Sequence, residues 1–346
     1  MVVNKKGFEL QFHWIFVLIA GALILAFFVS VAYKQRSFSE QKLSLSLSAD
    51  MEGVFTAAIQ GKGAAQVIPN PKVTFQCTQG CDCSFGVGRA RRGFGEKSIF
   101  ALTKSAPSLV VWSREVKLPY RLANVLLVTD PQVKYYLVGD RLDREFIQLT
   151  RSIPVFQTKE GVVPVINYEN VTPADLSSLR AQEDISRFVF VGVEPDFIDG
   201  SFEGREVSAI KLDVQGISFF LFEEGAFIRV ADVPRADLTT VFAAMFSVDA
   251  NSYRCGMQSL GRKAAIVARV YIDRAQDLKE YASAQGFIQC PVLYDNLLEN
   301  LQSQESSAKL LATTLQGSAL AGLAQGKELL ESQNRELVQA NCPELF

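Results

Sequence analysis

Residues 15–33, IFVLIAGALILAFFVSVAY, hold no charged side chain over 19 positions. At a helical rise of about 1.5 Å per residue this segment spans about 28 Å, close to the ~30 Å hydrocarbon layer of a bilayer. The segment therefore predicts a transmembrane helix. A helix in a soluble core is rarely so long without a polar residue, and a secretory signal peptide would have a shorter apolar region followed by a cleavage site of small residues.

The residues that flank this segment are typical of a membrane interface. Aromatic rings prefer the two interfaces and basic side chains the headgroup zone beyond them, where the chain has Lys5, Lys6, Trp14, Tyr33, Lys34 and Arg36. We divide this region into a basic leader (1–14), a transmembrane helix (15–33) and a juxtamembrane helix (34–61). Basic residues near the two ends of the span nearly balance, so charge does not decide its orientation.

Six cysteines indicate the compartment of the remaining chain, because disulfides persist outside the cytoplasm. Asn170-Val171-Thr172 is also an acceptor pattern for glycosylation in exported chains. We therefore expect a single-pass protein of the cell membrane, with a cytoplasmic amino terminus and its folded region outside.

The cysteines fall into two groups of three: Cys77, Cys81 and Cys83, then Cys255, Cys290 and Cys342. If all six pair within one chain, an odd number on each side requires at least one bridge between the groups. We expect one short bridge inside CTQGCDC, one bridge between helical segments, such as Cys255 to Cys290, and one bridge between the two groups of cysteines. The alternative is a zinc site made by the three close thiols and a fourth ligand. Because CxxxCxC differs from the usual CxxC knuckle of zinc sites, we predict no metal here.

Lys5-Lys6-Gly7 before Phe8 and the long apolar helix resembles the leader of type IV pilin-like (class III-like) proteins, especially archaeal single-pass membrane proteins. The Cys342-Pro343-Glu344-Leu345-Phe346 ending adds to this likeness. The resemblance implies cleavage after Gly7 and a helix that packs in a filament core or anchors a surface protein. That family usually has a glutamate at the fifth mature position, which is Phe12 here.

Beyond the span, the patterns predict a mixed α/β (α+β) region with a long helical carboxyl-terminal part. We expect a first β-rich α/β unit at 72–184, a second β-rich unit at 185–250 and a helical region at 251–346. Leucines of the tail do not keep a heptad, so this region packs on its own domain or against a partner helix.

The composition narrows the function. Lysine and arginine (35) nearly balance aspartate and glutamate (37), without the basic excess that nucleic-acid binding requires. The one histidine, His13, lies beside the span, so histidine-dependent nucleophile and metal sites are excluded from the folded region. No cofactor is predicted, and the SxxK spacing at Ser306 and Lys309 lies in a polar helix, so we do not assign it to catalysis.

Two groups of charged residues are candidates for binding. An acidic cluster for a cation or for acid-base chemistry consists of Glu194, Asp196 and Asp199. A basic loop for an anionic partner consists of Arg89, Arg91, Arg92 and Lys97, although such a run is more often a solvated hairpin tip.

These patterns favour a membrane-anchored structural or interaction protein of a cell-envelope or pilus-like assembly. Its expected partners are the lipid bilayer and either other proteins or further copies of the chain. The alternative is a membrane-tethered ligand-binding module or a carboxylate-dependent hydrolase. A pocket lined by Glu194, Asp196 and another convergent acid would favour the alternative.

Overall fold

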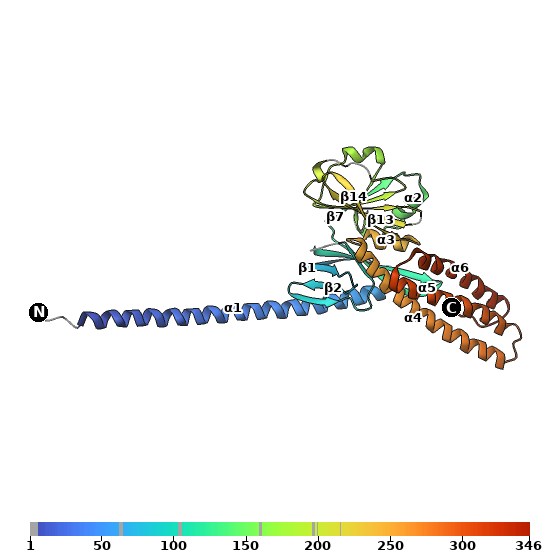
Figure 1. The fold of residues 1–346 in the computed structure, drawn as a ribbon, viewed down its shortest axis with the longest axis horizontal. Coiled ribbons are helices and arrows are strands. Elements are labelled where there is room, and N and C mark those ends of the chain that lie inside the picture. Colours follow the sequence, from blue (N-terminus) through green and yellow to red (C-terminus); the bar gives the residue numbers. More distant parts are fainter. Residues whose placement is uncertain are drawn as a thin grey trace.

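A computed structural model describes residues 6–61, 65–102, 106–158, 161–195, 198, 200–214 and 216–346. One long helix projects from a body made of two sheets and a group of helices (Figure 1). This arrangement confirms the mixed helix and strand composition predicted for the chain.

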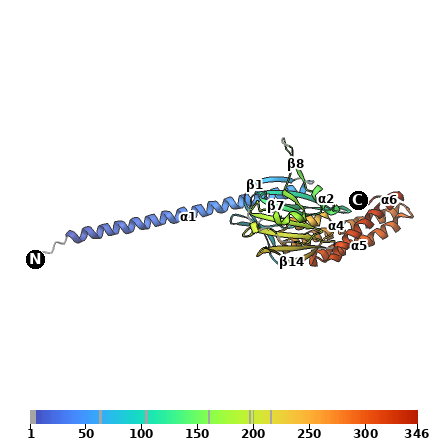
Figure 2. The same cartoon turned by 90° about the horizontal axis from the view of Figure 1, so that it is seen from above.

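The projecting helix α1 (Lys6–Gln60) is continuous. Its apolar amino-terminal part is exposed and is long enough to cross a membrane; among the described residues it is the one helix with this property. Its carboxyl-terminal part packs on the first sheet, and Figure 2 shows the rest extending away from the body. The predicted span and juxtamembrane helix are thus one element.

The first sheet, sheet A, has the strand order β3-β2-β1-β5-β6-β4. Its strands are β1 (Ala65–Cys77), β2 (Cys83–Val87), β3 (Ala90–Gly93), β4 (Ile99–Leu102), β5 (Ala106–Leu118) and β6 (Tyr120–Thr129). All neighbours are antiparallel except β4 and β6, which run parallel. The predicted basic loop is the β2–β3 hairpin, in which Gly88 has a φ of +58° at the turn, a backbone conformation that suits glycine.

The second sheet, sheet B, has the order β10-β7-β11-β12-β13-β14. Its strands are β7 (Val133–Gly139), β10 (Asn167–Val171), β11 (Ile185–Val191), β12 (Glu206–Leu212), β13 (Gly216–Glu223) and β14 (Ala226–Pro234). The first four strands in this order are parallel, and β12, β13 and β14 are antiparallel neighbours. A separate hairpin consists of β8 (Val155–Thr158) and β9 (Gly161–Pro164).

The sheets do not divide at the expected boundary between 184 and 185. Strand β7 pairs with β11 and β10 pairs with β7, so the second sheet begins near residue 133. The helix α2 (Arg144–Arg151) follows β7, with Asp143 accepting hydrogen bonds at its amino terminus. After Thr172 the chain forms a short 3-10 turn, Pro173–Ser178, which lies against sheet B through the buried Leu176.

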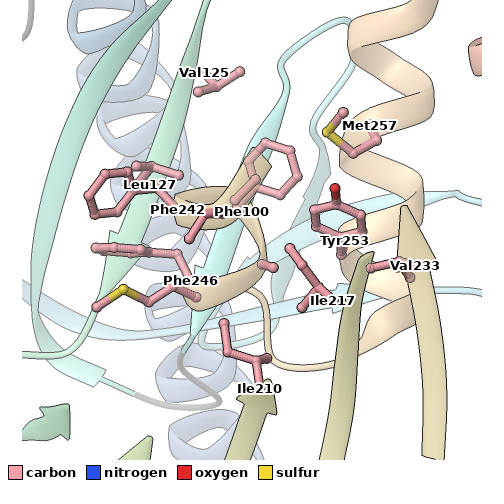
Figure 3. Packing of buried hydrophobic residues seen from close by; sticks show 14 of the residues in the cluster. Phe100, Val125, Leu127, Ile210, Ile217, Val233, Phe242, Phe246, Tyr253 and Met257 are labelled. Atoms are coloured by element: carbon pink, nitrogen blue, oxygen red, sulfur yellow. The ribbon is translucent and has the colours of Figure 1, made fainter. Parts of the chain in front are cut away.

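A short buried helix, α3 (Leu238–Met245), lies between the two sheets (Figure 1). Every residue from Thr239 to Met245 is buried, as expected for a helix that is covered on all sides. Figure 3 shows Phe242 and Phe246 among side chains from both sheets. Phe242 meets Trp112 of sheet A edge to face, with 4.8 Å between ring centroids.

Arg187 on β11 is a fully buried cation at the end of α3. Its Nη2 donates to the carbonyl oxygens of Ala244 (2.9 Å) and Ser247 (3.0 Å), where the negative end of the helix dipole favours positive charge. Its guanidinium also lies over the ring of Phe219. Burial lowers the pKa of Arg187 to about 10.

Three helices complete the chain, namely α4 (Ala250–Ala284), α5 (Cys290–Thr314) and α6 (Gly317–Gln339). They extend from the body on the side opposite α1 (Figure 1). Helices α4 and α5 cross closely at Gly261, where an added Cβ would stand 2.7 Å from the backbone nitrogen of Ala312. The helical tail therefore packs on its own domain.

Candidate functional site

The junction between α1 and sheet A determines how the body is attached to the span. Phe55 of α1 is fully buried and meets Phe85 of β2 edge to face, with ring centroids 5.3 Å apart. Met51, one turn earlier, is buried in the same apolar cluster. These residues lie three or four positions apart, so one stripe of the helix covers the sheet.

Glu52 forms the polar edge of this junction. It accepts a hydrogen bond from Arg92 of β3, and its other oxygen lies 3.4 Å from Nζ of Lys97. The hydrogen bond from Arg92, and then that from Lys97, lower the pKa of the Glu52 carboxyl. Two of the four cations of the predicted basic loop are therefore paired within the chain, by an acid that the sequence analysis did not identify.

The other cations of the loop lie on the same hairpin. Arg91 donates to Oε1 of Gln76 on β1 at 3.4 Å. Arg89, at the turn, also makes an interaction within the protein. The hairpin is thus tied to sheet A and α1 by most of its charges.

At the two ends of the predicted span, Trp14 and Tyr33 are exposed, with 67% and 72% of their surfaces accessible. Lys34 and Arg36 are exposed beyond Tyr33, and Arg36 donates to Glu40. Lys5 lies outside the described residues, and the side chain of Lys6 is not described. The described ends therefore match a helix whose aromatic and basic flanks meet an interface.

Two of the three disulfides are adjacent. Cys77 pairs with Cys83 across the β1–β2 hairpin, and Cys81 in the loop between them pairs with Cys255 of α4. The second bridge joins residues 174 positions apart and ties sheet A to the helical half. The predicted example, Cys255 to Cys290, does not form, because Cys255 lies in the first turns of α4 beside the β1–β2 loop.

The zinc alternative has a geometric basis, since Cys77, Cys83 and Cys255 present sulfur atoms within 4.8 Å of one another. In the structure these sulfurs are bonded in pairs, and none of the described cysteines is free. A disulfide sulfur lacks the negative charge of the thiolate that binds zinc. As bonded, this cluster is a structural brace.

The third bridge, Cys290 to Cys342, joins the start of α5 to the end of the chain. The terminal Phe346 packs against Tyr120 and Tyr271, whose rings stack at 4.1 Å. The hydroxyl of Tyr120 donates to Gln304 of α5 at 3.1 Å. The β5–β6 turn and the carboxyl terminus therefore hold the three helices in place.

Of the predicted acidic cluster, Glu194 is described and Asp196 and Asp199 lie outside the described residues. Glu194 accepts a hydrogen bond from Lys211 of β12, which also lies 3.2 Å from Asp213. The hydrogen bond that Lys211 donates to Glu194, and then the one to Asp213, raise the pKa of Lys211. The one described acid of the cluster is therefore half of a surface ion pair.

Asn170 is exposed on β10, an edge strand of sheet B. Its position leaves the side chain accessible for modification. The SxxK residues do not meet: Ser306 donates to the carbonyl of Gln302, and Lys309 pairs with Glu305 at 2.7 Å.

An apolar pocket of about 340 Å³ lies between sheet A and the helices α3, α4, α5 and α6. Figure 3 shows three of its lining residues, Phe100 and Val125 from sheet A and Met257 from α4. Charged side chains of β5 and α6, which are half-buried or exposed, also line it. No local sequence pattern indicates this pocket, because its lining comes from seven separate elements.

No protein-family model, curated protein or solved structure was found to match this chain.

Proposed function

We propose that the protein is a membrane-anchored, extracytoplasmic structural or interaction protein of a cell-envelope or pilus-like assembly. The observation that carries the proposal is the unbroken helix α1, which runs from the apolar span into the core of sheet A. A flexible linker would let the body move freely over the membrane, whereas a continuous helix holds it at a fixed distance.

The disulfides support the orientation. Three bridges suit an oxidising compartment, and so support a body outside the membrane with the amino terminus in the cytoplasm. Cleavage after Gly7, implied by the pilin-like leader, remains part of this proposal.

The exposed stalk, residues 34–43, supports a role in protein contacts. It spans about 15 Å between the membrane interface and the body, at about 1.5 Å per residue. Phe38 on the stalk and Leu45 just beyond it are 62% and 51% exposed. They are seven residues apart and so lie on the same face of α1, as the contact residues of paired helices do.

A photo-cross-linking residue at Leu45 tests the proposal in native membranes. We expect a covalent adduct with a protein, either another copy of the chain or a different envelope component. The matched control places the same residue at Ser46, which is equally far along the helix but turned by about 100°, and a much weaker adduct is expected there. Lipid adducts alone from both positions would refute an assembly role.

A ligand-binding module is the second candidate, and the apolar pocket favours it. A carboxylate-dependent hydrolase has less support, because Glu194 is already paired with Lys211. Assembly and ligand binding are compatible, since one protein can do both.

A further inference from the structure

The apolar pocket has a lining that is typical of a small-molecule site. Its buried walls include Phe100, Leu122, Leu260, Leu311, Leu320 and Leu323. Protein interiors rarely leave hollows larger than a water molecule, whereas ligand pockets measure about 300–1,000 Å³ and are mostly apolar. A volume of about 340 Å³ therefore belongs with ligand pockets.

The size of the pocket limits its occupant. At ~30 Å³ for a group the size of water, the volume of about 340 Å³ holds roughly eleven such groups. A single hydrocarbon chain of about ten to twelve carbons has this bulk. The two long chains of a bilayer phospholipid exceed it.

The opening of the pocket carries both signs of charge. Lys117 lies on β5, while Lys327, Glu328 and Glu331 project from neighbouring turns of α6. In the part of the chain that the structure describes, no ion pair involves Lys327, Glu328 or Glu331, whereas Lys117 pairs with Glu115 at 3.1 Å. A cation and two carboxylates are thus available at the opening to bind a ligand.

The remaining polar groups of the pocket are already hydrogen-bonded within the protein. The carboxylate of Asp237 accepts from the backbone nitrogen of Thr240 at the start of α3. The hydroxyl of Thr239 accepts from Nε of Arg114. These groups do not compete with α6 for the polar part of a ligand.

We propose that this pocket binds a single-chain amphiphile of about ten to twelve carbons whose head group carries both a positive and a negative charge. The chain occupies the apolar interior. The anionic part of the head pairs with Lys327, and its cationic part pairs with Glu328 and Glu331. Complementary charge at the opening gives the site its preference among amphiphiles with equal chains.

The experiment uses the full chain in lipid nanodiscs and a dodecylphosphocholine that carries a diazirine near the end of its chain. Irradiation followed by peptide mapping locates the adducts on the chain. Probe dissolved in the bilayer can therefore be told apart from probe in the pocket by the peptides that it labels. We expect saturable labelling of peptides from α4 and α6 that line the pocket. Labelling of α1 alone would overturn the proposal.

Two variants of exposed alanines on α6 provide a matched comparison. Ala324 lines the pocket and is exposed, so Ala324→Trp places an indole at the opening; Ala321 is exposed and is not among the lining residues. We expect Ala324→Trp to reduce pocket labelling at least tenfold and Ala321→Trp to change it less than twofold. Equal labelling of the two variants would refute binding in this pocket.

Probes of different structure test the claim without any variant. Half-maximal labelling is expected at a concentration at least fivefold higher for chains of six or eighteen carbons. The same increase is expected for twelve-carbon probes whose head is only trimethylammonium or only carboxylate. If the six-carbon and eighteen-carbon probes label the pocket as well as the twelve-carbon probe does, the assigned size is wrong. If the charge of the head group has no effect on labelling, the assigned head group is wrong.

Discussion

Replacing Phe55 with alanine tests whether the body is joined to α1 by packing. Phe55 is fully buried, and its ring contacts Phe85 at 5.3 Å and Phe75 at 6.1 Å between centroids. Removing a buried phenylalanine ring typically costs about 3–5 kcal/mol through lost burial and the cavity left behind. We therefore expect Phe55→Ala to lower the free energy of unfolding by about 4 kcal/mol, a large part of the 5–15 kcal/mol of a typical domain.

The assay is urea unfolding of the full chain in detergent micelles, followed by circular dichroism, with hydrogen exchange measured on the segment 47–60. The control is Phe38→Ala on the same helix, where the ring is 62% exposed. That change is expected to alter the free energy by less than about 0.5 kcal/mol. If the two variants lose equal stability, or if Phe55→Ala leaves exchange in 47–60 unchanged, the attachment of α1 by sheet A is refuted.

Three further predictions concern other contacts. Glu52→Gln should lower the melting temperature near pH 7 but not well below pH 4.5. The reason is that a carboxyl with a depressed pKa stabilises the fold at pH values above its unfolded-state pKa (4.5) and loses this effect as the pH falls. A difference in melting temperature that did not change with pH would contradict this. Gly261→Ala should lower the free energy of unfolding by about 1–3 kcal/mol, because its Cβ would stand 2.7 Å from a backbone atom of α5. Gly53→Ala, where an added Cβ meets open space, should raise it by up to about 1 kcal/mol. The opposite order of stability in denaturant titrations would refute this packing. Replacing Cys81 and Cys255 together with serine should cost about 2–5 kcal/mol, measured by thermal unfolding under non-reducing conditions, and a loss below 1 kcal/mol would argue against the bridge.

The sequence predicted those elements whose signals are local. The uncharged run of residues 15–33 indicated the apolar part of α1, and the helical region expected at 251–346 became α4, α5 and α6. The hairpin of β2 and β3 was treated as a loop because its glycines and arginines lack the alternation of a strand. Its pairing with β1 compensates for that weak local preference.

Sheet membership and the contacts between distant residues could not be predicted. Strand β7 lies between β10 and β11, and nothing in its own residues indicates which sheet it joins. Counting cysteines required a bridge between the two halves, but the choice of Cys81 and Cys255 depends on how α4 lies against sheet A. The burial of Arg187 likewise could not be predicted, because its hydrogen-bond acceptor at Ala244 depends on how α3 packs against β11.

The bridge between Cys81 and Cys255 encloses all of sheet B within one covalent ring of the chain. A single cut by an endopeptidase anywhere in that ring would leave both fragments linked and both still attached to α1. The molecule would migrate as an intact chain until a thiol reagent opened the ring. A single cut within sheet B therefore would not separate any fragment from the rest of the protein.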